Sequence, residues 1–211
     1  FGSGIRTYLQ TTVRLRTAQL DNPNRFFDVG SGDRQPDVEV SLVTDLAAGR
    51  FGTRLSGGYN LQLPGNQNRR VARFDQPLAP ITTLAGVRRD PGDVLMLGAK
   101  PFFRLATYLS LFGGVEYWSK QRDVFTYAQG QPPIEGVDID VLGDGTRSDA
   151  LLLSGGLTYS HSGLDKRGIL KLPMDASFRY QRIARSGNGI VPDLSSMAID
   201  FRLYTRLFGR N

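Results

Sequence analysis

The run IRTYLQTTVRLRT at residues 5–17 alternates two kinds of side chain. From Ile5 to Leu15 the odd positions carry Ile, Thr, Leu, Thr, Val and Leu, whereas the even positions from Arg6 to Arg16 carry Arg, Tyr, Gln, Thr, Arg and Arg. Successive side chains of a β-strand point to opposite faces. A period of two therefore predicts a strand with one apolar and one polar face.

The same alternation recurs along the chain and predicts eight antiparallel strands. Each is long enough to cross the hydrocarbon of a bilayer at a tilt, which takes roughly 9 to 11 residues. No apolar run approaches the roughly 20 residues of a membrane-spanning helix. The strands are predicted at residues 5–17, 37–47, 51–63, 93–103, 107–119, 150–160, 172–182 and 196–208.

The connections between these strands alternate in length. Long or polar connections occupy residues 18–36, 64–92, 120–149 and 183–195, and shorter ones occupy residues 48–50, 104–106 and 161–170. Outer-membrane barrels show this alternation because their periplasmic turns are short and their extracellular loops are longer. The sequence therefore predicts an all-β fold: one antiparallel, up-and-down transmembrane β-barrel over residues 1–211, most simply with eight strands and with both termini in the periplasm.

The last predicted strand carries a further pattern. Residues 199–208, IDFRLYTRLF, resemble the closing strand of bacterial outer-membrane proteins, which alternates and finishes on an aromatic residue. Here Gly209, Arg210 and Asn211 follow the aromatic Phe208, which departs from that pattern. In size the chain is similar to the small OmpA and OmpX class. The resemblance implies the outer membrane of a Gram-negative cell.

The composition narrows the functional classes. The 211 residues contain no cysteine, which excludes disulfides, thiolate metal ligands and cysteine nucleophiles. The net charge is +6, but the basic residues are dispersed among apolar ones, so no nucleic-acid partner is predicted. The chain opens on FGSG without the regions of a signal peptide, so we expect a processed chain or part of a longer one.

If the apolar face meets lipid, the charges of the polar face must be paired or hydrated. Facing positions in the antiparallel hairpins predict three ion pairs: Arg14 with Glu39, Arg16 with Asp37, and Arg179 with Asp200. The interior of an eight-stranded barrel is only wide enough for side chains, so a polar plug is expected. A lumen that conducts small solutes is the alternative. The predicted lumen-facing residues are Arg6, Arg14, Arg16, Asp37, Glu39, Asp45, Arg54, Lys100, Glu116, Arg179, Asp200, Arg202 and Arg206.

Two predicted outer loops carry concentrated charge. In the second loop, guanidinium groups suit phosphate and predict contacts with lipopolysaccharide, with ordinary solvated charge as the alternative. These arginines are Arg69, Arg70, Arg73, Arg88 and Arg89. In the third loop an acidic run partly resembles a calcium loop, but Leu142 stands where an oxygen ligand is expected and no glutamate ends the run. No metal is predicted there, and the weak calcium candidates are Asp138, Asp140, Asp144 and Asp149.

His161 is the only histidine and lies between Ser160 and Ser162. Outer-membrane serine hydrolases invite comparison, but a nucleophile needs a base within hydrogen-bond reach and a third group that orients the base. This histidine falls in a predicted periplasmic turn with no identified acid beside it. The sequence therefore predicts no enzyme and no cofactor.

The sequence as a whole predicts a non-enzymatic outer-membrane β-barrel with a plugged lumen and four outer loops. Those loops are expected to serve envelope support, surface interaction or docking into a larger complex. The expected partners are outer-membrane lipids, lipopolysaccharide and other envelope proteins. Three alternatives stay open: a porin-like passive channel that favours small anions, the C-terminal part of a wider transport barrel, and a soluble lipocalin-like barrel with its apolar face inward.

Overall fold

The computed structural model describes residues 4–20, 22–24, 35–73, 79–161, 173–189, 191 and 193–204. Within these ranges the chain is all-β, as predicted, and its only helical segments are two short 3₁₀ turns, η1 (Ile81–Thr83) and η2 (Ile139–Gly143). The strands form two antiparallel sheets, one of eight strands and one of three.

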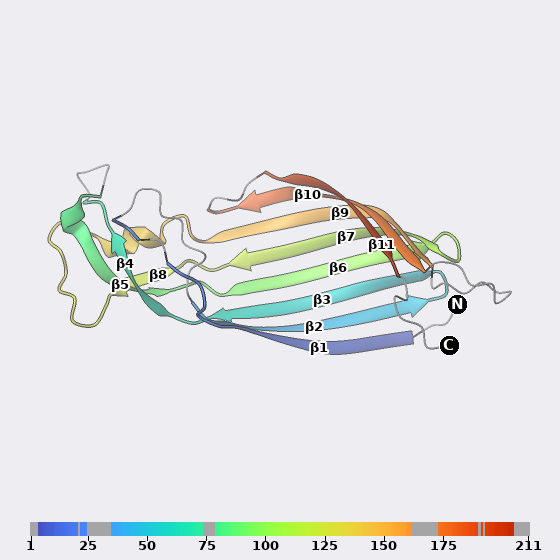
Figure 1. Cartoon of the computed structure of the whole chain (residues 1–211), viewed down its shortest axis with the longest axis horizontal. Coiled ribbons are helices and arrows are strands. Elements are labelled where there is room, and N and C mark those ends of the chain that lie inside the picture. The colour runs from blue at the N-terminus through green and yellow to red at the C-terminus, as the bar shows by residue number, and fades with distance from the viewer. Residues whose placement is uncertain are drawn as a thin grey trace.

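The large sheet is a meander with the strand order β1-β2-β3-β6-β7-β9-β10-β11 (Figure 1). Its eight strands overlap the eight predicted segments, so these strands and their antiparallel pairing are confirmed. Residues 205–208 of the last predicted strand lie outside the described residues. The strands are β1 (Gly4–Arg14), β2 (Asp37–Ala48), β3 (Phe51–Gln62), β6 (Val94–Arg104), β7 (Leu109–Lys120), β9 (Ser148–His161), β10 (Met174–Gly187) and β11 (Ser195–Leu203).

The large sheet has two edges, β1 and β11. Figure 1 shows that the sheet is curved and that β11 crosses over its neighbours in this view. Within the described ranges no ladder joins β11 to β1, so a closed barrel is not observed.

The connections follow the predicted alternation of length as far as β9. The last two reverse it, because the seven residues 188–194 join β10 to β11, where a long loop is predicted, whereas the twelve residues 162–173 separate β9 from β10, where a shorter one is predicted. At one end of the sheet β2 turns into β3 through Gly49 and Arg50 alone, and Gly49 takes a φ of 59°, which glycine enters without steric cost. Four residues, 105–108, join β6 to β7 at the same end. The long connections, including those from β3 to β6 and from β7 to β9, lie at the opposite end.

A second, three-stranded sheet lies in the two longest of these connections, where the sequence predicts only loops. Its strands are β4 (Gly65–Arg70), β5 (Leu84–Asp90) and β8 (Val124–Tyr127), in the order β4-β5-β8. Each continues a strand of the large sheet after a short break: β3 leads into β4, β5 into β6, and β7 into β8. The small sheet is therefore an extension of three neighbouring strands of the large sheet, and Figure 1 shows it at the left.

Among the described residues, three of the five buried apolar side chains lie in the small sheet. Ala85, Val87 and Phe125 form a cluster, against which Tyr127, Ile134, Ile139 and Leu142 pack. The segment after β8 thus covers one face of the small sheet and excludes water from it. In the large sheet the situation is reversed, because its apolar side chains are largely exposed.

The register of the first hairpin differs from the prediction by two residues. Arg14 faces Asp37, whereas Glu39 faces Thr12, and Arg16 lies beyond the last pair of the ladder. A shift of two residues keeps every side chain on its predicted face, so the apolar pattern alone does not select between the two registers. The predicted faces are correct. The predicted facing positions are wrong, and so is the pair of Arg16 with Asp37, but Arg14 still reaches Glu39 from the neighbouring position and forms the predicted ion pair with it.

The last hairpin shows the same displacement. Arg179 faces Ala198, and Asp200 faces Ser177. The predicted pair of Arg179 with Asp200 is therefore wrong by two residues, for the same physical reason.

Candidate functional site

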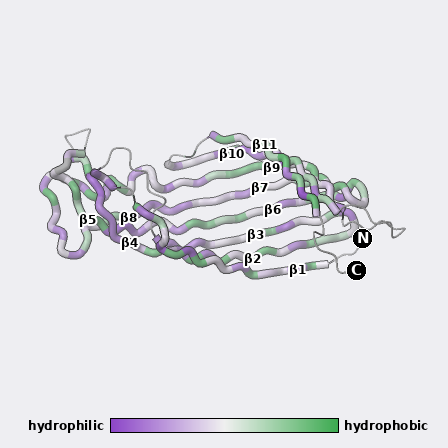
Figure 2. The backbone as a smooth tube through the Cα atoms, viewed as in Figure 1, coloured by the Kyte–Doolittle hydropathy of each residue, from purple (hydrophilic) through white to green (hydrophobic). Residues whose placement is uncertain are grey.

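The apolar face of the large sheet extends without interruption over all eight strands. Facing pairs such as Leu9 with Leu42 and Leu111 with Leu157 place apolar side chains beside each other in neighbouring strands. Figure 2 shows the resulting alternation of hydrophobic and hydrophilic segments along the strands. The larger side chains of the apolar face are all at least 36% exposed, and they are Ile5, Leu9, Val13, Val40, Leu42, Phe51, Leu55, Tyr59, Leu61, Leu95, Leu97, Leu111, Val115, Tyr117, Leu153, Leu157, Phe178, Tyr180, Met197, Ile199, Phe201 and Leu203.

The opposite face carries paired charges. The Arg14 guanidinium lies 2.7 Å from an Asp37 carboxylate oxygen and 2.9 Å from one of Glu39, so a single arginine bridges two acids. Arg54 donates two hydrogen bonds to Asp45, from Nε at 2.7 Å and from Nη2 at 3.0 Å. The fork geometry of a guanidinium matches a carboxylate in this arrangement.

A cavity of about 690 Å³ lies mainly on this polar face, near the short-turn end of the sheet. Arg6, Arg54 and Lys100 line it, together with the rings of Phe102 and Phe112. Lys100, on β6, also forms an ion pair of 2.5 Å with Glu116 on the neighbouring strand β7.

A smaller cavity of about 290 Å³ lies on the same face near β11. Asp175, Asp200 and Arg202 line it. Asp175 accepts hydrogen bonds of 2.6 Å from both Ser160 and Tyr204, and it is a polar-face residue that sequence reasoning missed. Of the predicted lumen-facing residues, Arg206 lies outside the described residues.

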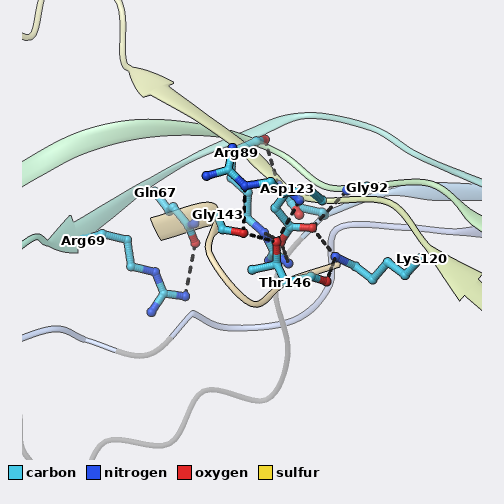
Figure 3. Close-up of polar contacts among 10 residues, drawn as sticks. Gln67, Arg69, Arg89, Gly92, Lys120, Asp123, Gly143 and Thr146 are labelled. Carbon is cyan, nitrogen blue, oxygen red and sulfur yellow. Dashed lines mark hydrogen bonds and ion pairs between the residues drawn. The ribbon is translucent and has the colours of Figure 1, made fainter. Parts of the chain in front are cut away.

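The junction between the two sheets is organised by Asp123, which the sequence analysis did not identify (Figure 3). Its side chain is only 2% exposed and accepts hydrogen bonds from Arg89 Nε at 2.9 Å, from the Gly92 amide at 3.0 Å and from the Lys120 ammonium group. Burial acts to raise the pKa of Asp123, but the hydrogen bonds from Lys120, Gly92 and Arg89 outweigh it and hold the pKa below its ordinary value. The ionised carboxylate is the form that fits this site.

A second aspartate serves the same junction. Asp93 accepts a hydrogen bond of 2.9 Å from the backbone N–H of Gln62 and one of 2.6 Å from the Tyr59 hydroxyl. Pro64 and Pro91 stand in the two neighbouring breaks and have no amide hydrogen to donate to a ladder. Carboxylate side chains therefore hydrogen-bond to backbone donors where the regular ladder is interrupted.

Two carboxylates of the acidic segment after β8, Asp140 and Asp144, form ion pairs with Arg122. Arg122 donates to both carboxylate oxygens of Asp140 and to one of Asp144, each at 2.9 Å. This contact lowers the pKa of Asp140. Asp138 instead caps η2 by accepting from the Asp140 amide, and Asp149 accepts from Asn188.

The four calcium candidates are therefore engaged in other contacts: Asp140 and Asp144 share Arg122, Asp138 caps η2, and Asp149 accepts from Asn188. Among the described residues no group of three or more acidic or histidine side chains is placed to hold a metal ion.

The five arginines of the second predicted loop are dispersed. Arg89 pairs with Asp123, Arg70 donates to Asn24 at 2.6 Å, and Arg69 donates to Gln67 at 3.4 Å. Arg73 is half-buried, whereas Arg88 is exposed on β5. They do not form one continuous basic patch.

His161 lies within β9 rather than in a turn. It is 5% exposed and its ring packs against Tyr108, with the ring centroids 4.4 Å apart. Ser160 points to the other face of the strand, where it donates to Asp175. The acid and the serine thus lie on the face opposite the histidine, and Ser162 lies outside the described residues.

No protein-family model matches this sequence, and no curated protein is significantly similar to it. In the part of the chain that the structure describes, no helix combines the length and the apolarity needed to cross a membrane.

Proposed function

We propose that this chain is a non-enzymatic β-barrel of the bacterial outer membrane, which presents a folded platform, the small sheet, on the outer surface. In this proposal β11 pairs with β1, the apolar face meets lipid and the paired charges fill the lumen. The observation that carries the proposal is the exposed apolar face that covers all eight strands of the large sheet.

The size of the apolar face favours a lipid environment. Full burial of one large apolar side chain contributes roughly 1.5–3 kcal/mol. Partial burial summed over eight strands therefore exceeds the roughly 5–15 kcal/mol of a typical domain's net stability. Soluble monomers rarely expose continuous apolar surface on this scale. Hydrocarbon is the medium that covers such a face without a specific partner.

Glycines indicate which face lies inside the curve. A Cβ added at Gly156, on the polar face, would collide with the Phe178 carbonyl oxygen and lie 2.8 Å from the Phe112 ring. A Cβ added at the neighbouring Gly155, on the apolar face, would meet nothing closer than 3.6 Å. The polar face is the crowded, concave side, which argues against a lipocalin-like barrel with its apolar face inward.

In hydrocarbon, the two edge strands of the large sheet would have to pair with each other and so close the barrel. An open sheet edge leaves backbone donors and acceptors unpaired, which is not tolerated in hydrocarbon. The edge strands carry the most exposed apolar side chains, Ile199 at 81% and Ile5 at 77%. With an even number of antiparallel strands, β1 and β11 run in opposite directions along the sheet, as an antiparallel ladder between them requires.

Engineered disulfides test this closure directly, because the chain has no cysteine of its own. Thr7→Cys on β1 is combined in turn with Met197→Cys, Ile199→Cys and Phe201→Cys in protein reconstituted into lipid. We expect one combination to form an intramolecular disulfide, seen as a faster-migrating monomer on a gel. Crosslinking only between molecules, or in no combination, contradicts the closed barrel.

Cysteine labelling tests whether the apolar face contacts lipid. In proteoliposomes, Leu97→Cys on the apolar face should be protected from a water-soluble maleimide, whereas Gln129→Cys beyond the small sheet should react. Rapid labelling of Leu97→Cys in folded protein contradicts a lipid-facing sheet.

A passive anion channel is the second candidate, and the cavity of about 690 Å³ with its basic lining favours it. Conductance of the folded chain in a planar bilayer separates the two functions. Stable openings that prefer anions support a channel, and silence supports a plugged barrel.

A further inference from the structure

Two arginines from distant parts of the sequence meet in one cavity at the junction of the two sheets. Arg16 follows β1, and Arg88 lies on β5. Both line a cavity of about 450 Å³, which contains no acidic side chain among its lining residues. The remaining polar lining comes from Asn66, Thr126 and the segment around Gln129.

Each of these two arginines has another arginine close to it in the sequence that already forms ion pairs. Arg14 is paired with Asp37 and Glu39, and Arg89 with Asp123. By contrast, Arg16 donates to the Pro64 carbonyl oxygen at 3.1 Å, and neither Arg16 nor Arg88 forms an ion pair with another described residue. Two guanidinium groups without an opposing carboxylate thus remain in the cavity, with donors available for a ligand.

We propose that this cavity binds a phosphorylated saccharide. A phosphate group matches the donor geometry of guanidinium, and the amide and hydroxyl side chains suit the hydroxyl groups of a sugar. The volume lies within the roughly 300–1,000 Å³ of small-molecule sites. The same chemistry occurs in the headgroup of a phosphorylated glycolipid and in a soluble sugar phosphate.

The position of the cavity connects it to the proposed function. It lies at the long-loop end of the large sheet, at the base of the small sheet, which is the outward end if the barrel spans the outer membrane. The ligand source rests on that proposal, but binding itself does not, because the cavity is formed by residues outside the strands that would contact lipid.

Calorimetric titration of the folded full-length chain in detergent micelles tests the site, with glucose 6-phosphate, inorganic phosphate and glucose as probes. We expect glucose 6-phosphate to bind more tightly than inorganic phosphate, and glucose not to bind. Arg16→Gln and Arg88→Gln should each raise the Kd for glucose 6-phosphate roughly tenfold, which corresponds to about 1.4 kcal/mol.

Arg50→Gln is the matched control, because it removes the same charge at the short-turn end of the sheet. Its Kd should equal that of the unmodified chain. Equal weakening by Arg50→Gln, an unchanged Kd in both cavity variants, or equal affinity for phosphate and glucose 6-phosphate overturns the proposal.

Nanodiscs distinguish the two sources. If a glycolipid headgroup occupies the cavity, discs that contain a phosphorylated glycolipid should abolish glucose 6-phosphate binding in the unmodified chain; retained binding identifies a soluble ligand. The disulfide assay between β1 and β11 on the same preparations reports the barrel independently. Closed protein that does not bind glucose 6-phosphate in detergent refutes only the cavity.

Discussion

Asp123 is the only buried carboxylate among the described residues. Its carboxylate is buried and binds two cations and one backbone amide that come from both sides of the junction. Removing one partner of a buried ion pair leaves the other charge uncompensated, which costs about 3–5 kcal/mol. The integrity of the small sheet therefore depends on this residue.

We expect Asp123→Asn to destabilise the small sheet by roughly 3 kcal/mol, because Arg89 and Lys120 lose their counter-ion. Hydrogen exchange of the β5 and β8 amides should accelerate by about a hundredfold, since each 1.4 kcal/mol is a factor of ten. Exchange in β2 and β3 should not change. Asp193→Asn, an exposed carboxylate in the last loop, serves as the control and should leave β5 and β8 protected.

The same carboxylate makes the small sheet sensitive to acid. The pKa of Asp123 is lower in the folded chain than the value near 3.9 of an unfolded aspartate. Its contribution to stability is thus fully present above that unfolded value and is lost as the pH falls through the folded pKa. Protection of β5 and β8, corrected for intrinsic exchange rates, should fall below about pH 4. Asp123→Asn should remove most of this pH dependence, and an identical dependence in that variant contradicts the assignment.

At the scale of elements, neighbouring glycines of β9 have different roles. A Cβ added at Gly156 would collide with the Phe178 carbonyl oxygen, whereas one added at Gly155 would make only an ordinary van der Waals contact with the Phe112 carbonyl oxygen at 3.6 Å. We expect Gly156→Ala to destabilise the folded chain by about 1–3 kcal/mol, the usual cost of overpacking. Gly155→Ala should have little effect. Unfolding of the two variants in denaturant, followed by circular dichroism, measures the difference, and equal midpoints would show that the polar face is not the tighter one.

The strands of the large sheet were predictable because a period of two runs through them, even where β9 places Leu152 on the polar face. The small sheet was not. β4 reads GNQNRR and is polar throughout, and β8 has four residues, so neither offers an alternation that stands out from a loop. These strands exist because they continue β3 and β7 and pair with β5, which is a tertiary cause.

The candidate sites also contain features that the sequence predicts and features that only the fold determines. The faces of Arg14, Asp45 and Arg54 follow from alternation, whereas their partners depend on a register that alternation does not select. Asp123 could not be identified from the sequence, because two of its three partners lie 31 and 34 residues away. Arg16 and Arg88 lie far apart in the sequence, and only the folded chain brings them to one cavity.

At the scale of the whole molecule, the apolar face determines where the chain is stable. In lipid, Leu97→Arg near the middle of β6 should cost about 2–4 kcal/mol, whereas Phe51→Arg at the short-turn end should cost about 0–1 kcal/mol, because the cost of a charge depends on its depth in the bilayer. Reversible unfolding from lipid vesicles by denaturant gives both values. Similar costs at the two positions contradict a membrane-spanning orientation.

Three strands of the large sheet run directly into the small one, and this continuity bears on slippage. Sliding one strand past its neighbour by two residues keeps every apolar side chain on the apolar face, so the alternating pattern alone does not penalise that error. A strand whose outer end is fixed by a packed, water-excluding cluster and a buried ion pair does not slide without unfolding that cluster. We therefore expect β3, β6 and β7 to resist a shift of register more strongly than the strands that do not continue into the small sheet.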